Sequence, residues 1–159
     1  DLHAYGSDPR VSRFMDWGPN SDADSREVLD RMLAEQAEWP RDNVSLAIEL
    51  KSEGRLVGSI RLSVIAPEPP TAELGYTLAA DCWRRGLCTE AAAAVVDVGF
   101  RSLGLYRIVA TCNRRNRGSW GVMRKLGMRR EGCFRRDRQV KGEWRDTYLY
   151  AIRSDEWAG

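Results

Sequence analysis

The sequence lacks any long run of apolar residues, and it has a single histidine. The longest apolar stretch, Ala91 to Val96, is far shorter than the roughly 18 residues that span a bilayer, which excludes a transmembrane helix. The four cysteines form no C-x-x-C pair, and His3 alone cannot complete a common zinc set, so we expect no metal site. We expect four reduced thiols in a cytoplasmic protein, with two disulfides in a secreted protein as the alternative.

Neither the composition nor the N-terminus indicates a disordered or exported chain. Hydrophobic residues make up 43% and charged residues 30% of the sequence, which excludes intrinsic disorder. The length of 159 residues suits one domain with one core, so we expect a single domain over residues 1–159. No signal or transit peptide is recognisable, and the chain begins at Asp1 rather than Met, so we expect that a preceding piece is missing.

The two parts of the chain differ strongly in charge. Residues 1–100 carry 10 Lys and Arg against 17 Asp and Glu, whereas residues 101–159 carry 15 against 6. A basic C-terminal part favours an anionic partner, which is a phosphorylated cofactor, an acidic substrate or nucleic acid.

Hydrophobic periodicity predicts strands and helices along the chain. The expected strands cover residues 44–50, 56–65, 72–78, 106–112, 128–140 and 144–152, and the expected helices cover residues 24–39, 89–103 and 117–126. Asp24 with Glu27 is typical of a capping box at the first helix, which Pro40 ends. Residues 66–70 are rich in proline and predict a surface loop, and residues 2–19 show no clear period.

The order of these elements predicts the fold class. The first three strands form an antiparallel meander with a turn at Gly54, and a β-α-β unit follows. A second helix ends at Gly127, and the last two strands form a hairpin that turns at Lys141 and Gly142. We therefore expect an α+β (mixed α/β) fold with helices packed on a sheet.

The segment most informative about function is Trp83 to Glu90 (WRRGLCTE), which joins a strand to an Ala-rich helix. Gly86 lets the backbone approach a ligand, and the N–H groups of the first helical turn point at that ligand with the positive end of the helix dipole behind them. This arrangement suits a diphosphate; a plain connection with solvated arginines is the alternative. The spacing of a P-loop and the glycines of a dinucleotide fingerprint are both missing, which excludes those two sites.

Other motifs lie in order around this segment. Residues 73–76 (ELGY) precede it, residues 113–119 (NRRNRGS) open the next helix, residues 125–128 close that helix, and residues 142–146 lie in the hairpin. Together, over roughly residues 8–157, they resemble the GNAT superfamily of acetyl-CoA-dependent N-acyltransferases. More narrowly they resemble its RimJ/RimL-type branch, which acetylates the N-terminal amines of ribosomal proteins. The resemblance implies a mostly antiparallel mixed sheet that is splayed at its centre, helices on both faces, and a first family strand that is missing.

The resemblance also implies how acetyl-CoA binds. In the family the pantetheine arm enters the gap beside the splayed strand, here at Thr77, Leu78 and Ala79, and the loop after that strand wraps the pyrophosphate. The residues matched to that loop are Arg84, Arg85, Gly86, Leu87, Cys88, Thr89 and Glu90. Cys88 stands where the family usually has Gly or Ala, and Trp83 stands where Gln or Arg is frequent.

The catalytic residues follow from the same resemblance. Glu73 matches the carboxylate that takes a proton from the acceptor amine, directly or through a water, and an ordinary strand glutamate is the alternative. Ser119 matches the hydroxyl that reaches the leaving sulfur, and Asn116 holds the pantetheine or caps the helix. A backbone N–H near Leu78 would hold the oxyanion. No histidine accompanies Cys88, Cys112 or Cys133, so we expect direct transfer in a ternary complex.

The acceptor is less defined by the sequence. We place Trp17, Tyr76 and Trp144 on the substrate side, and we expect an amine acceptor, either a ribosomal-protein N-terminus or a small molecule such as an antibiotic or a polyamine. We expect a monomer or a homodimer that needs no membrane and no nucleic acid.

A second hypothesis is a non-catalytic module that binds RNA or an acidic protein. It rests on eight arginines of the basic part, which are Arg114, Arg115, Arg117, Arg129, Arg130, Arg135, Arg136 and Arg138. Sequence-tolerant RNA binding would need exposed aromatic residues among them, and only Trp120 and Phe134 are present there, so the enzyme is favoured.

Overall fold

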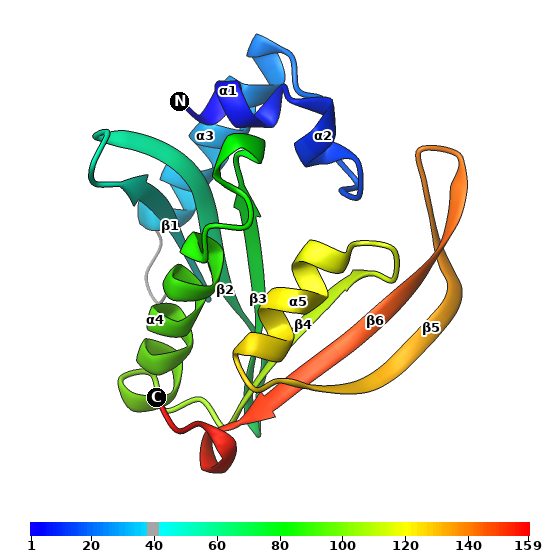
Figure 1. Ribbon diagram of the computed structural model, residues 1–159. Coiled ribbons are helices and arrows are strands. Elements are labelled where there is room, and N and C mark those ends of the chain that lie inside the picture. The colour runs from blue at the N-terminus through cyan, green and yellow to red at the C-terminus, as the bar shows by residue number, and fades with distance from the viewer. Residues whose placement is uncertain (38–41) are drawn as a thin grey trace.

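The computed structural model describes residues 1–37 and 42–159, and its centre is a six-stranded sheet in the order β1-β2-β3-β4-β6-β5 (Figure 1). The strands are β1 (Asn43–Leu50), β2 (Arg55–Pro67), β3 (Pro70–Leu78), β4 (Arg107–Asn113), β5 (Arg129–Val140) and β6 (Glu143–Arg153). The helices are α1 (Leu2–Gly6), α2 (Pro9–Ser12), α3 (Asp22–Ala37), α4 (Leu87–Arg101) and α5 (Arg117–Lys125), with short 3-10 turns η1 (Ala80–Cys82) and η2 (Ser154–Glu156). The expected elements are present within two residues of their expected ends, and the expected helix end at Trp39 and Pro40 lies outside the described residues.

The sheet is mixed, as expected. Neighbouring strands pair antiparallel except β3 and β4, which are parallel because α4 carries the chain back between them. The hairpin turns are where the sequence predicts them, with positive φ at Gly54, Lys141 and Gly142.

Two local expectations are wrong. The loop expected over residues 66–70 is only two residues long, because Pro67 and Pro70 pair in register at the ends of β2 and β3, where a missing N–H costs little. The first long helix is capped by Ser21 rather than by Asp24: the N–H of Asp24 donates to Ser21 Oγ at 3.2 Å, and the N–H of Ser21 donates to the Asp24 carboxylate at 2.9 Å. Residues 2–19 hold α1 and α2, which are too short to show a period.

Helices cover both faces of the sheet. On one face α4 packs closely, because a Cβ built on its Gly99 would lie 3.0 Å from Ile108 of β4 and 3.3 Å from Leu62 of β2. On the other face α3 lies against β2, where Glu35 pairs with Arg61 at 3.7 Å. Because successive strand residues point to opposite faces, Leu62 is buried under α4 while Arg61 faces α3. Leu62 therefore belongs to the core under α4, whereas the face toward α3 carries polar residues such as Arg61 beside the buried Tyr5 of α1.

Candidate active site

The two central strands separate after three paired residues. Residues 71–73 of β3 pair with residues 107–109 of β4, whereas β3 continues to Leu78 and β4 to Asn113. Beyond that point β3 pairs only with β2, and β4 pairs only with β6. The strands diverge toward their C-terminal ends, as Figure 1 shows, and the expected splay at the centre of the sheet is confirmed.

The divergence leaves backbone groups of β3 facing the gap. The N–H of Ala79 donates to Val57 O at 2.7 Å, and antiparallel pairing alternates along a strand, so the backbone groups of Leu78 point away from β2. The Leu78 carbonyl accepts a hydrogen bond from the indole N–H of Trp83 at 2.8 Å. Trp83 therefore fixes the peptide group between Leu78 and Ala79, which adjoins the Leu78 N–H that the motif resemblance implies for the oxyanion.

The helix start that follows this strand has an open N-terminus. Gly86 is the N-cap of α4 with φ of 84°, a left-handed conformation that suits glycine, and no side chain caps the helix there. A Cβ built on Gly86 has no atom within 4 Å among the described residues. The N–H groups of Thr89 and Glu90 bond back to Gly86 O at 2.9 and 3.0 Å. The earlier N–H groups of this turn and the dipole of a 15-residue helix suit a phosphate anion.

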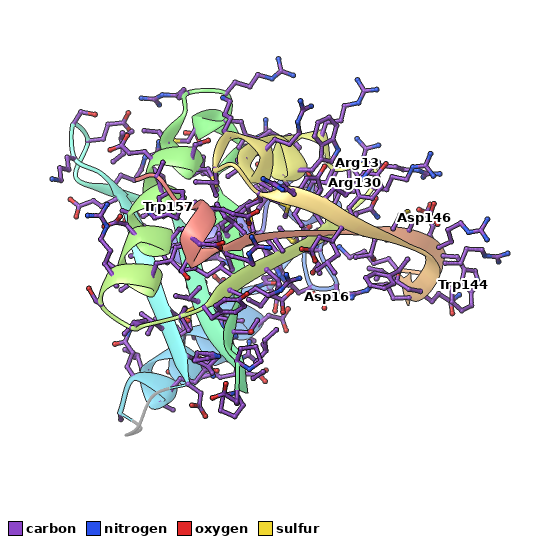
Figure 2. All side chains as sticks on the ribbon, turned by 90° about the horizontal axis from the view of Figure 1, so that it is seen from below. Arg13, Asp16, Arg130, Trp144, Asp146 and Trp157 are labelled. Atoms are coloured by element: carbon purple, nitrogen blue, oxygen red, sulfur yellow. The ribbon has the colours of Figure 1, made fainter. Side chains whose placement is uncertain are left out.

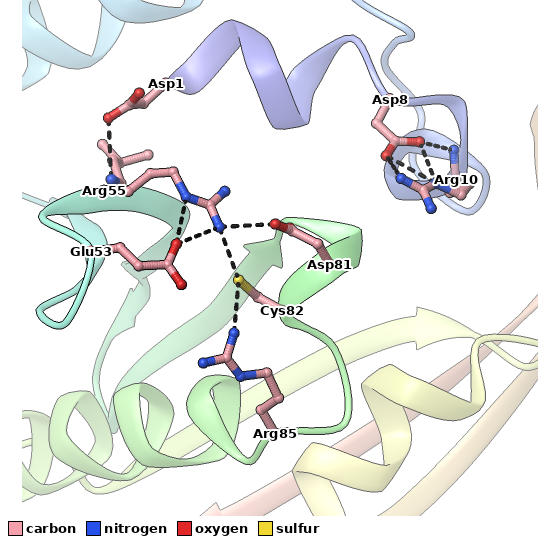
Figure 3. Close-up of polar contacts among 9 residues, drawn as sticks. Asp1, Asp8, Arg10, Glu53, Arg55, Asp81, Cys82 and Arg85 are labelled. Carbon is pink, nitrogen blue, oxygen red and sulfur yellow. Dashed lines mark hydrogen bonds and ion pairs between the residues drawn. The ribbon is translucent and has the colours of Figure 1, made fainter.

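The arginines beside this helix start differ in how they are held (Figure 3). Arg84 and Arg85 are exposed, and Arg85 contacts only the thiol of Cys82 at 4.0 Å among the polar contacts of Figure 3. Arg55, which sequence reasoning did not select, is tied to Asp81 at 2.9 Å and Glu53 at 3.0 Å. Arg84 and Arg85 are thus the arginines available to a ligand at this loop.

The N-terminus of α5 meets β3 across the gap. The Asn116 side chain caps α5 by accepting from the N–H of Ser119 at 3.2 Å, which is the alternative to its expected role in holding the pantetheine. The Tyr76 hydroxyl donates to Ser119 O at 2.8 Å and lies 3.2 Å from Ser119 Oγ. Burial raises the pKa of Tyr76, with the Ser119 hydrogen bond opposing, so its hydroxyl stays protonated. Tyr76 therefore orients the residue expected to face the leaving sulfur.

A cavity of about 450 Å³ lies beside the gap. The expected site residues that line it are Trp17, Glu73, Tyr76, Thr77, Asn116 and Ser119. The cavity lining does not include the other expected cofactor residues, which are Leu78, Ala79 and residues 84–90. These residues lie between the end of β3 and the start of α4. The structure therefore brings the two expected catalytic residues to one cavity.

Glu73 has a partner that sequence reasoning missed. The Thr111 hydroxyl of β4 donates to Glu73 Oε1 at 2.9 Å, and both residues line the cavity. Thr111 lies two positions beyond Val109, the residue opposite Glu73, so strand alternation puts it on the same face. The hydrogen bond holds the carboxylate in the opening between the strands.

The thiols near the cavity are protonated at neutral pH. Burial raises the pKa of Cys88 to about 12, and burial raises the pKa of Cys112 to about 11, where a Ser119 hydrogen bond opposes. Cys112 lines the cavity. Because the thiolate is the nucleophilic form, neither side chain is poised to attack a thioester.

The two tryptophans assigned to the substrate side are in different places. Trp17 lines the cavity, but Trp144 does not. Trp144 lies near the end of the β5–β6 hairpin (Figure 2), where it is 54% exposed and stacks against the Arg136 guanidinium at 5.5 Å. Trp144 alternates with Arg145 along β6, and it is Arg145 that lines the cavity.

One wall of the cavity contains Asp16, Trp17 and Arg145, and it brings an N-terminal segment against the β5–β6 hairpin. Lys141 Nζ donates to Ser12 O at 2.8 Å, and Arg145 Nη2 donates to Arg13 O at 3.2 Å. These bonds hold the hairpin against the segment that carries Asp16 and Trp17, and Figure 2 shows Asp16 under the hairpin. Sequence reasoning did not select this wall, because its parts are far apart along the chain.

The fold and the site define a class of enzyme. The motif resemblance implies three features for acyl-CoA-dependent N-acyltransferases, and the structure has them. These are a mixed sheet that opens between two parallel strands, a helix start that suits a phosphate, and a hydroxyl and a carboxylate in the opening. Comparison with known proteins indicates the same class of enzyme. Residues 1–129 match the family described as acetyltransferase (GNAT) domain, and the chain belongs to this family.

Two relatives match almost the whole chain, and a third matches about half of it. YnaD of Bacillus subtilis (strain 168), described as an uncharacterized N-acetyltransferase, is 33% identical over 156 residues, which cover 98% of this chain and 88% of YnaD. The crystal structure of a GNAT-family acetyltransferase from Bacillus anthracis is 34% identical, with a TM-score of 0.85 over 98% of this chain and 88% of that one. The ribosomal protein uS5-alanine N-acetyltransferase of Escherichia coli (strain K12) is 30% identical over 84 residues, covering 53% of this chain and 43% of that enzyme.

Two expectations are confirmed by these relatives. The chain is an acyltransferase, and its resemblance to the RimJ/RimL-type branch agrees with its similarity to a ribosomal-protein enzyme. Among the helices of the described ranges, none has the length and apolar character needed to cross a membrane.

Proposed function

We propose that this acetyltransferase moves the acetyl group of acetyl-CoA to a primary amine by direct transfer in a ternary complex. The observation that carries the proposal is the opening between β3 and β4, with Glu73 and Ser119 on the walls of one cavity. Acetyl-CoA supplies an acetyl group that is already activated as a thioester. The cytoplasmic location, the single-domain organisation of residues 1–159 and the absence of a metal requirement are parts of this proposal.

The donor would be held at the gap and at the start of α4. The pantetheine arm would lie along residues 77–79, where the backbone groups of Leu78 face the gap and those of Thr77 and Ala79 pair with β2. Residues 84–90 bind the diphosphate through N–H groups, helix dipole and guanidinium groups. The open space at Gly86 supports this fit, because no atom of residues 1–37 or 42–159 fills the volume that a side chain would occupy there.

Three groups of this chain would assist the transfer. An α-amine has a pKa near ~8, so a modest base suffices, and Glu73 accepts the proton, directly or through a water. The N–H of Leu78 donates to the acetyl oxygen as it gains negative charge. The Ser119 hydroxyl donates to the departing sulfur. The raised pKa values of Cys88 and Cys112 support direct transfer over a cysteine-linked path.

An amine acceptor is supported by relatives that act on such groups. One is the uS5-alanine enzyme, and another is the spermidine N(1)-acetyltransferase of Escherichia coli (strain K12), 27% identical over 103 residues. Both a protein N-terminus and a small amine are therefore candidates. Of the residues we assigned to the acceptor, Trp17 and Tyr76 stay in the proposal because they line the cavity.

Donor binding and turnover test the proposal separately. Acetyl-CoA at about 100 times its Kd should raise the melting temperature by about 5–11 °C, because a gain of about 2.7 kcal/mol corresponds to about 2–4 °C per kcal/mol for a chain of this size. Thiol release from acetyl-CoA should then depend on an added amine. Absence of both effects, with every amine and N-terminal peptide tried, would overturn the proposal.

A pair of serine variants isolates the leaving-group role. Ser119→Ala removes the hydroxyl but keeps the backbone carbonyl that binds Tyr76, so the acetyl-CoA thermal shift should persist. Turnover should fall by about 10- to 100-fold, at or below the lower end of what positioned acids contribute. Ser102→Ala, an exposed serine at the end of α4, is the matched control and should keep wild-type turnover. Equal rates for the two variants would remove Ser119 from the mechanism.

A further inference from the structure

The acceptor side of the cavity carries an excess of positive charge. The charged residues that line it are Arg31, Arg61, Arg138 and Arg145 against Asp16 and Glu73. Arg138 and Arg145 belong to the basic C-terminal part of the chain and lie on the β5–β6 hairpin. In Figure 1 this hairpin and α4, whose start suits the donor phosphates, lie on opposite sides of β3, so these two arginines are not placed for the donor.

The two hairpin arginines are direct cross-strand neighbours. Arg138 of β5 is opposite Arg145 of β6 in the register, an arrangement of like charges that destabilises a sheet unless an anion compensates. Arg138 has Asp137 at 3.3 Å from its Nε. A third cation, Lys141, lies close by: burial lowers its pKa first and the charge of Arg145 lowers it further, with Asp16 opposing.

Arg145 has a hydrogen-bond donor that the fold does not use. Its Nη2 donates to Arg13 O at 3.2 Å, but its Nη1 is buried and has no partner within residues 1–37 and 42–159. A buried guanidinium N–H without an acceptor is costly, and the acceptors that fit its planar fork are carboxylate and phosphate oxygens. Arg145 lines the cavity, so an anionic group of a ligand bound there would lie beside this guanidinium group.

We propose that the acceptor is a small amine that also carries a carboxylate, held by Arg145 with Arg138 beside it while the amine faces Glu73. This inference rests on the proposed function and names its substrate class. The new N–C bond forms as the C–S bond breaks, the proton of the amine passes to Glu73, and the departing sulfur takes the proton of the Ser119 hydroxyl. Water then returns a proton to Ser119 and takes the one held by Glu73, so the net transfer is from amine to thiol. A polyamine, which has only positive charge, meets repulsion at these arginines.

Matched acceptors provide the test. The panel consists of free L-amino acids, the corresponding L-amino acid carboxamides and spermidine, assayed by thiol release from acetyl-CoA. The carboxylate should raise kcat/KM over the matched carboxamide by about 10- to 100-fold, the range for hydrogen bonds to charged groups. A second pair, the dipeptide amides Ala-Asp-NH2 and Ala-Asn-NH2, shows whether a peptide side chain can supply the carboxylate instead.

Variants of the hairpin assign the preference to Arg145. Arg145→Gln should bring kcat/KM for the carboxylate form down to that for the carboxamide, through a higher KM for the carboxylate form, and Arg145→Lys should restore part of the preference. Arg135→Gln, an exposed arginine of β5 outside the cavity lining, is the control and should keep the preference. Melting temperatures of all variants exclude loss of fold as the cause.

The results separate this inference from the proposed function. Carboxamides or spermidine that react as well as the free amino acids, or an Arg145→Gln variant that slows both acceptor forms equally, would overturn the carboxylate assignment while the acetyltransferase stands. Acetyl-CoA binding without turnover of any carboxylate-bearing amine would overturn it as well. Loss of acetyl-CoA binding in the wild-type protein would instead overturn the proposed function.

Discussion

Gly58 of β2 is the position where a single methyl group should do the most damage to the donor gap. A Cβ built on Gly58 lies 2.2 Å from the carbonyl oxygen of Thr77 and 3.1 Å from the Cα of Leu78, both backbone atoms of β3. Backbone cannot move aside as a flexible side chain can, so Gly58→Ala must push β3 away from β2. The bond between the Ala79 N–H and Val57 O, at 2.7 Å, is the nearest to break.

The expected cost follows from these contacts. Overpacking costs about 1–3 kcal/mol, and each lost hydrogen bond costs about 1 kcal/mol. The lower chain entropy of alanine in the unfolded state returns about 0.4–1 kcal/mol. We therefore expect Gly58→Ala to lower the free energy of unfolding by about 2–3 kcal/mol, and the melting temperature by about 4–12 °C.

Urea denaturation at pH 7 measures this loss, and Gly75→Ala is the matched control. Gly75 lies in β3 of the same sheet, and a Cβ there meets no atom of the described chain within 4 Å. The free energy of unfolding of the Gly75→Ala protein should stay within about 0.5 kcal/mol of the wild-type value. A Gly58→Ala protein as stable as the wild type, or a Gly75→Ala protein equally destabilised, would refute the close approach of these two strands.

Two further predictions concern Trp83 and the thiols. Trp83→Phe removes the indole N–H that holds Leu78 O, so KM for acetyl-CoA should rise about three- to tenfold with kcat nearly constant, and an unchanged KM would contradict the positioning role. The pKa of Cys112 is raised by burial from 9.0 to about 11, so the folded state gains stability that is complete below pH 9 and lost as the pH rises through 11. The urea midpoint should therefore fall as the pH is raised from 8 to 11, and it should fall less in Cys112→Ala than in the wild type. An equal fall in both proteins would show that this thiol does not cause the loss of stability.

The elements were predictable from the sequence because their signals are local. Gly54 and Gly142 mark turns wherever they stand in space, since glycine adopts a positive φ without steric cost. Ser21 was missed because both Ser21 and Asp24 are good capping residues, and only the helix start shows which one lies outside the helix.

The site was only partly predictable, because its remaining contacts join distant residues. The motif order identified Glu73 and Ser119, but the Thr111 partner of Glu73 depends on the parallel register of β3 and β4, which no local pattern encodes. Trp144 was chosen for its ring, whereas strand alternation turns its neighbour Arg145 into the cavity. Thr147, two positions further along β6, lines the cavity on the same face as Arg145.

The bond between Lys141 and Ser12 spans 129 positions of the chain, and the bond between Arg145 and Arg13 spans 132. On the ribosome, the first segment therefore waits for its partner until residues 141–145 have been made, while β1, β2 and β3 can already form their meander. The cavity beside the hairpin is then completed after that meander. A nascent chain halted before residue 141 would have the first three strands but could not enclose an acceptor.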